Sequence, residues 1–142
     1  MINKCFIFAS VCCFFAALLH VGCIIFGPDW YLFLGAGQQM ASMAEAGLIE
    51  PTIITSMIAI ILTMWGFYGL SGAGVIVQLP FQNPALGLIA CVLIFRGLSF
   101  PLLMPKFPEN SLTFWVVSSA ICLVMGISFA LGIWLKVKNT RT

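Results

Sequence analysis

The sequence predicts an all-α integral membrane protein, a four-helix bundle with an amphipathic interfacial helix in its first outer loop. Of its 142 residues, 62% are hydrophobic and only 7% are charged, whereas a soluble domain carries roughly 25% charged residues. Four apolar stretches are each long enough to cross a bilayer. They are continuously apolar rather than alternating, which disfavours the strands of a β-barrel. We therefore expect one transmembrane domain over residues 1–142.

The four predicted spans separate cleanly along the chain. They cover about residues 5–26, 52–76, 85–104 and 112–135. The first run, of about 22 residues, exceeds the 7 to 15 residues of a signal-peptide core, so we expect it to remain as a span. Pro51, Pro84 and Pro105 lie where helices should start or stop, and Pro101 should kink the end of the third span.

The long first loop predicts an interfacial helix over about residues 30–46. Asp29 can cap its start, and its apolar and polar residues fall near different faces. Gly47 is placed to end it, Pro51 suits the first turn of the next helix, and Glu50 would lie at the positive end of that helix. Two interpretations stay open: a helix that caps the bundle, or a lid or re-entrant wall of a binding site.

The charge distribution predicts the orientation in the membrane. Basic residues flank the first and last spans, namely Lys4, Lys136, Lys138 and Arg141. The first loop is acidic and contains Asp29, Glu45 and Glu50. The positive-inside rule therefore places both termini in the cytoplasm. In a bacterium the protein would be a multi-pass protein of the inner, plasma membrane. The net charge of +2 is too small for the protein to bind a nucleic acid. The hydrophobic composition instead makes the lipid bilayer its expected surroundings.

Cofactor and metal chemistry find little support in the sequence. The six cysteines lie inside apolar runs and none forms a CxxC pair, which argues against the small quinone-linked enzymes that make disulfides. The single histidine, His20, cannot by itself supply a zinc site or the paired imidazoles of a haem. We therefore expect no catalytic residue, metal or cofactor.

Arg96 is the most informative candidate for a binding site. It lies about eleven residues into a predicted span of about twenty, and so near the bilayer midplane. An arginine there costs at least ~2.5 kcal/mol, so it should face the bundle or a wet cavity and be paired. It either binds an anionic or polar ligand or forms an internal tie to Glu45, Tyr68 or a backbone carbonyl.

Five further residues complete the candidate ligand-binding set. His20 lies on the outer side of the first span, at a depth that Arg96 can reach, and is either a core hydrogen-bonding residue or a proton relay. Trp65 and Tyr68 share one face of the second span and either line a pocket or fill the core. Gln38 and Glu45 lie on the polar side of the interfacial helix.

A stripe of small side chains runs along the fourth span at four-residue intervals. Its members are Ser118, Cys122, Gly126 and Ala130. Small residues let another helix approach closely in a membrane, so the stripe predicts a helix-packing surface. The partner is either another span of the same chain or a second protomer or partner subunit.

Three segments carry a resemblance to known proteins. GPDWYLFLGAGQQMA, PTIITSMIAIILTMWGFYGLSGAG and FRGL at positions 95–98 resemble a group of small bacterial inner-membrane proteins usually described only as hypothetical membrane proteins. The resemblance covers most of residues 20–100 and weakens through the last span. It implies four helices and the inner membrane, and it carries no activity. Size and topology are also loosely similar to DoxX-like proteins.

Three functions are compatible with these residues. The first is a non-enzymatic protein that binds or passes a small polar or anionic solute at the level of Arg96 and His20. The second is an accessory or assembly subunit of a larger membrane complex. The third is a membrane enzyme acting on a lipid or isoprenoid, with His20 or Glu45 as general acid or base, which the scarcity of carboxylates disfavours.

Overall fold

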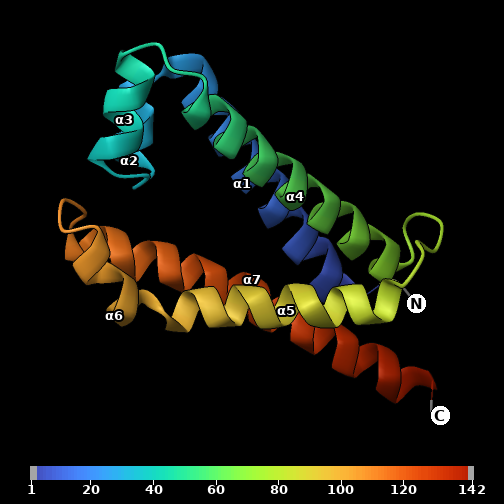
Figure 1. The fold of residues 1–142 in the computed structure, drawn as a ribbon. Helices are drawn as coiled ribbons and strands as arrows, with labels where there is room; N and C mark the ends of the chain where they lie inside the picture. Colours follow the sequence, from blue (N-terminus) through green and yellow to red (C-terminus); the bar gives the residue numbers. More distant parts are fainter. Residues whose placement is uncertain (1–2, 141–142) are drawn as a thin grey trace.

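The computed structural model describes residues 3–140, and within this range the chain forms helices joined by loops, with no strand (Figure 1). The four long helices are α1 (Lys4–Phe26), α4 (Glu50–Ala73), α5 (Gln82–Leu98) and α7 (Leu112–Thr140). The short ones are α2 (Pro28–Phe33), α3 (Gln38–Glu45), α6 (Phe100–Leu103) and the 3-10 turn η1 (Met104–Lys106). The predicted all-α class is confirmed. Arg141, part of the predicted basic tail, lies outside the described residues.

Helices α1, α4 and α7 are long and apolar enough to cross a membrane. A fourth span is added if α5 and the bent segment Phe100–Lys106 cross together. Only 22% to 33% of the most apolar window of each of these three helices is buried inside the protein. Large side chains such as Leu18, Ile25 and Phe95 are instead more than two-thirds exposed, at 68%, 69% and 72%. Such a surface indicates a membrane protein, because lipid is the solvent that would cover it.

The predicted third span contains a sharp bend. Helix α5 ends at Leu98, and the segment Phe100–Lys106 turns away from it by 58°. Pro101 causes this break, because it has no N–H to donate and its ring would clash with the carbonyl of Gly97 in a continuous helix. The Ser99 hydroxyl donates to the carbonyl of Phe95 at 2.6 Å. The predicted kink at Pro101 is confirmed, and it leaves a straight helix of 17 residues.

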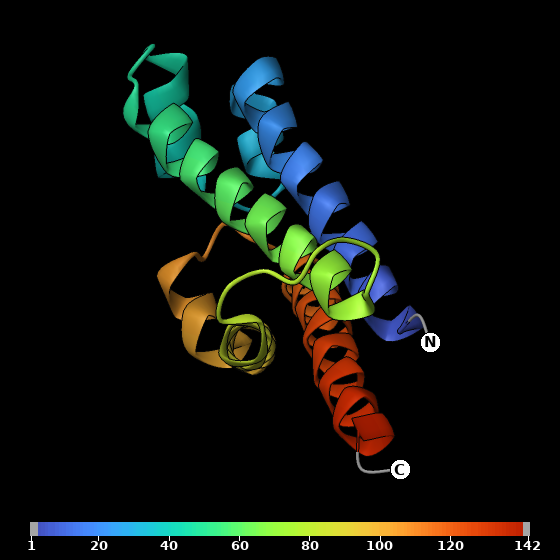
Figure 2. The ribbon, with the colours of Figure 1, turned by 90° about the vertical axis from the view of Figure 1, so that its right-hand side faces the viewer.

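The long helices form two antiparallel pairs rather than an even bundle. Helix α1 pairs with α4 and α5 with α7, and these are the most extensive contacts in the fold. The pairs meet where the α4–α5 loop lies and diverge toward α2, α3 and α6 (Figure 1). Figure 2 shows α5 nearly end-on beside α7, with α1 and α4 side by side. We call the first region the convergent end and the region of α2, α3 and residues 107–111 the capped end.

The main core lies toward the convergent end, where all four long helices meet. Its buried members are Phe6, Ala9, Cys13, Ala73, Leu86, Ile89, Ala90, Leu93, Met125 and Phe129. The Phe6 ring lies so close to α7 that a Cβ on Gly132 would come within 2.7 Å of it. Asn3 adds a polar tie, because its backbone N–H donates to Ala73 and its side-chain amide to Gly132 at 2.8 Å. The first residue described thus joins α1, α4 and α7.

The first loop contains two short helices where the sequence predicts one over residues 30–46. Gly35 and Gly37, with φ of 71° and 93°, adopt backbone conformations that side-chain-bearing residues rarely take, and they turn the chain between α2 and α3. A second small core holds the two helices together, with Cys23, Tyr31 and Ala41 buried in it. Gly47, with φ of 72°, follows α3 as predicted.

Candidate functional site

The candidate site lies where α5 and α7 cross, and two glycines bring these helices together. A Cβ on Gly126 of α7 would lie 2.9 Å from the backbone nitrogen of Ile94. A Cβ on Gly97 of α5 would lie 2.5 Å from Leu123 and 3.0 Å from the carbonyl oxygen of Ser119. Both contacts are closer than a real Cβ tolerates, so glycine is needed at both positions. At Gly126 the small-residue stripe therefore packs within the chain.

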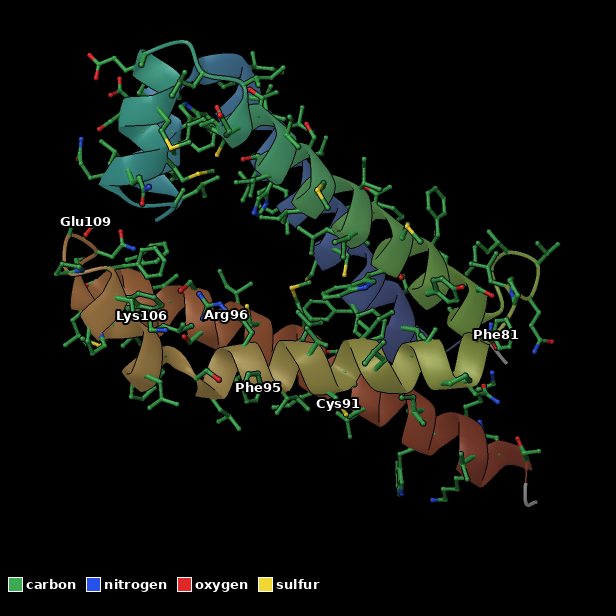
Figure 3. The ribbon with its side chains drawn as sticks, in the orientation of Figure 1. Phe81, Cys91, Phe95, Arg96, Lys106 and Glu109 are labelled. Carbon is green, nitrogen blue, oxygen red and sulfur yellow. The ribbon has the colours of Figure 1, made fainter. Side chains whose placement is uncertain are left out.

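Arg96 lies beside this crossing, in the last turn of α5. Its guanidinium carbon lies 5.5 Å from the centroid of the Trp115 ring on α7. A cation over the face of an indole is attracted by the negative charge of that face. Figure 3 shows Arg96 on the side of α5 toward α7, while Phe95 and Cys91 point away from it. The ring covers one face of the guanidinium, so the N–H groups in the guanidinium plane stay available to donate hydrogen bonds.

Three buried donor groups at the crossing have no hydrogen-bond partner among residues 3–140. They are Nη1 of Arg96, Nε1 of Trp115 and the hydroxyl of Ser119. Trp115 and Ser119 are each only 3% exposed, and a four-residue spacing places them on one face of α7. Each unsatisfied buried polar group costs about 1–3 kcal/mol. An acceptor bound at any of these three groups would remove that cost.

No acidic side chain balances the charge of Arg96. Within the part of the chain that the structure describes, Arg96 forms no ion pair and no hydrogen bond. The four acidic residues, Asp29, Glu45, Glu50 and Glu109, are all exposed. The internal tie to Glu45 considered for Arg96 is therefore absent from these described residues. Among residues 3–140, the half-buried Arg96 therefore has its ring contact with Trp115 but no hydrogen-bond acceptor.

The bend at Ser99 changes the expected place of Arg96 along its helix. The sequence puts it near the middle of a span over residues 85–104, whereas the structure puts it three residues before the cap residue Ser99. It therefore lies closer to the capped end than the sequence predicts. Figure 3 shows Lys106 and Glu109 farther along in the same direction.

The other predicted span residues are engaged elsewhere. His20 has Nδ1 at 2.7 Å from the carbonyl oxygen of Ala16, one turn back on its own helix. Trp65 packs against the main core. The Tyr68 hydroxyl donates to the carbonyl of Pro80 at 3.1 Å, in the α4–α5 loop. No hydrogen bond within residues 3–140 joins any of the three to Arg96.

Helix α3 reaches the second helix pair through its first residue. The backbone N–H of Gln38 donates to Oε1 of Glu109 at 2.9 Å, and the Asn110 amide donates to the carbonyl of Gly35 at 3.1 Å. The Phe114 ring fills the space beside Gly35, which has no Cβ to obstruct it. These contacts dock α2 and α3 on the loop before α7 and so bridge the two pairs at the capped end. Glu45, at the other end of α3, is exposed.

The Glu109 carboxylate is the one acidic group in this bridge. Accepting the backbone N–H of Gln38 stabilises its charged form, and this lowers its pKa below the usual glutamate value. The bridge is therefore strongest when Glu109 is ionised. Because Glu109 is exposed, water screens this interaction.

Trp115, Ser119 and Glu109 are not among the site residues that the sequence predicts. Periodicity carries a weak signal for the first two, because Trp115, Ser119 and Cys122 recur at helical spacing next to the small-residue stripe. The contact of Arg96 with the Trp115 ring shows that this face of α7 meets the arginine. Glu109 has no sequence signal, because its partner Gln38 lies 71 residues away along the chain.

Comparisons with protein-family models, with curated proteins and with solved structures find no match to this chain. Among residues 3–140, no group of three or more His, Cys, Asp or Glu side chains is placed to hold a metal ion. The function must therefore be argued from the site itself.

Proposed function

We propose that this chain is a multi-pass protein of a bacterial inner membrane that binds or passes a small solute bearing anionic oxygens at Arg96. The observation that carries the proposal is the set of three buried donors without partners, on Arg96, Trp115 and Ser119. A carboxylate or phosphate supplies hydrogen-bond acceptors, and its negative charge complements the positive charge of Arg96. Hydrogen bonds from charged donors to such oxygens are among the strongest in proteins.

The capped end favours a solute that arrives from the outer side. Helices α2 and α3 extend from the α1–α4 pair and touch the loop before α7 through Gln38 and Glu109. Arg96 lies in the last turn of α5, toward that same end. This arrangement supports the lid interpretation of the first loop, with the Glu109 bridge as the contact that would open. Four helices of one chain are too few to enclose a path across the membrane, so passage of the solute would require an oligomer.

Anion-dependent thermal stabilisation of the protein in mild detergent tests the proposal. The probes are inorganic phosphate and acetate, each compared with sodium chloride at equal ionic strength, because a ligand that binds only the folded state raises the melting temperature. We expect a rise for wild type that Arg96→Met abolishes. Lys138→Met is the matched control, because Lys138 also stacks on an indole, that of Trp134, with 5.3 Å between its ammonium nitrogen and the ring centroid.

Two outcomes would contradict the proposal. Equal shifts with chloride and with the two oxyanions would show only general screening of charge. Equal loss in Arg96→Met and Lys138→Met would show that any basic residue suffices. A positive result would be followed by solute flux in liposomes, which separates binding from transport.

The alternatives have weaker support. An assembly subunit would use the small-residue stripe for a partner, but Gly126 already packs against Ile94 of the same chain. A lipid enzyme would need an acid–base pair, but Nδ1 of His20 is engaged with the Ala16 carbonyl of its own helix, and Glu45 is exposed at the end of α3. Native mass spectrometry from mild detergent would reveal a stably bound partner subunit.

A further inference from the structure

The convergent end carries a polar network that holds Lys136 in place. The Ser71 hydroxyl accepts the side-chain N–H of Gln82 at 2.6 Å and the backbone N–H of Leu79 at 2.9 Å. The side-chain oxygen Oε1 of Gln82 in turn accepts from the Lys136 ammonium, which also donates to Oδ1 of Asn83 at 2.9 Å. Ser71 and Gln82 are each 5% exposed. Buried anchors on α4 and α5 therefore fix the position of the lysine on α7.

A pocket of about 340 Å³ lies beside this lysine, between the start of α5 and the last turns of α7. Three of its lining residues are polar and three are apolar: Asn83, Lys136 and Thr140, and Leu86, Ile133 and Val137. Such a lining suits a molecule with a polar head and an apolar chain. Lys136 has three N–H donors and uses two, so one stays available to a ligand.

The charge at this end is entirely positive among the described residues. Lys4, Lys136 and Lys138 lie here, whereas all four acidic side chains of the chain lie on α2, α3, the first turn of α4 or the loop before α7. The start of α5 adds the positive end of a helix dipole. If the termini are cytoplasmic, as the sequence predicts, the pocket faces the leaflet surface that is rich in anionic lipids.

We infer that this pocket binds the headgroup of an anionic phospholipid. The lipid phosphate accepts from the free N–H of Lys136, and the start of an acyl chain lies along Leu86, Ile133 and Val137. Basic pockets between membrane helices at the cytoplasmic surface bind such headgroups. The site shares no residue with the Arg96 crossing, so neither inference depends on the other for its ligand.

Native mass spectrometry from mild detergent measures the bound lipid directly. The probes are phosphatidylglycerol, phosphatidylcholine and inorganic phosphate. Wild type should retain phosphatidylglycerol at least about fivefold more than phosphatidylcholine, since one lysine at a membrane surface contributes about that factor. Lys136→Gln should lose this preference. Lys138→Gln is the matched control and should keep it within about twofold, because Lys138 stacks on Trp134 and does not line the pocket.

A second variant separates loss of the site from loss of folding. Val137→Trp would fill the pocket from an exposed position and keep every charge, so it should also lose the lipid. Retention by Val137→Trp, or equal loss in Lys136→Gln and Lys138→Gln, would overturn the inference. Displacement of the lipid by inorganic phosphate at equal ionic strength would also overturn it, because the pocket would then take a soluble phosphate. Arg96→Met should bind phosphatidylglycerol like wild type.

Discussion

Gly126 on α7 faces the backbone of Ile94 on α5 so closely that a Cβ there would lie 2.9 Å from the Ile94 nitrogen. A flexible side chain could move aside, but a helix backbone moves only with the whole helix. This contact fixes the crossing at which Arg96 meets Trp115. The glycine therefore couples the packing of the two helices to the geometry of the candidate site.

Gly126→Ala should destabilise the protein by about 1–3 kcal/mol, the usual cost of overpacking. Gly87→Ala is the matched control on α5, because a Cβ there meets nothing within 4 Å. That change should be neutral or stabilising by up to about 1 kcal/mol, since alanine favours a helix more than glycine does. Thermal melts of the two variants in one detergent give the comparison. Equal melting temperatures would mean that α5 and α7 do not meet at Gly126.

Reporter fusions should place both termini in the cytoplasm and the loop at Gly47 outside. A periplasmic phosphatase fused after Thr142 should be inactive, and the same enzyme inserted after Gly47 should be active. The physical reason is the asymmetry between the basic residues near the termini and the acidic first loop. Gly47 suits an insertion because a Cβ there would touch nothing within 4 Å. An active phosphatase at the C-terminus would reverse the topology.

Arg96→Met should change the free energy of unfolding by less than about 1 kcal/mol, because the desolvation of the unpaired guanidinium offsets what its contacts contribute. The methionine sulfur can also pack against the Trp115 ring. Arg96→Glu should destabilise the protein by about 2–3 kcal/mol, since it puts an unpaired carboxylate over the negative face of that ring.

Detergent melts and the yield of membrane-inserted protein measure both Arg96 variants. Arg96→Lys serves as the control that keeps the charge. A Met variant that fails to accumulate while the Lys variant succeeds would show that Arg96 braces an acceptor inside the protein.

The helices could be predicted from sequence because each depends on a local pattern. The first span, predicted over residues 5–26, is observed as Lys4–Phe26. Pro101 gave the position of the bend in the third span, although its 58° angle depends on packing. The apolar pattern of the first loop predicts one helix over residues 30–46, whereas the structure divides it at Gly35 and Gly37. Both glycines have positive φ angles, and the Phe114 ring, which is distant in the sequence, packs where a Cβ of Gly35 would lie.

Of the residues at the candidate site, only Arg96 could be predicted from the sequence. Arg96 stands out because a charge in an apolar run is costly and needs an explanation. Its partner Trp115 could not be predicted, because the packing of α5 against α7 decides which of several aromatic residues contacts the guanidinium. His20 is grouped with Arg96 by its depth in the membrane, and Trp65 and Tyr68 by their shared face of the second span. The helix pairs diverge toward α2, α3 and α6 (Figure 1), so equal depth in the membrane does not by itself bring a side chain of one pair into contact with a side chain of the other.

The docking of α2 and α3 on the second helix pair should weaken in acid. In the folded protein the hydrogen bond from Gln38 lowers the pKa of Glu109, so this bond favours folding wherever Glu109 is ionised. That contribution is fully present above the usual glutamate pKa of about 4.3 and is lost as the pH falls through the lowered folded value. Hydrogen exchange at the Gln38 amide, corrected for its intrinsic pH dependence, should therefore quicken in that window.

Glu109→Gln isolates this effect from the titration of other carboxyl groups. The glutamine oxygen can still accept the Gln38 N–H, but the bond is no longer charge-assisted and is weaker. The variant should exchange faster than wild type at pH 7, and the two should converge as the pH falls through the lowered pKa. Glu45→Gln, at the exposed end of α3, is the control and should exchange like wild type at pH 7. If Glu109→Gln and wild type differ equally at pH 7 and in strong acid, the carboxylate charge does not hold the cap, and α2 and α3 are docked by the Phe114 contact with Gly35 instead.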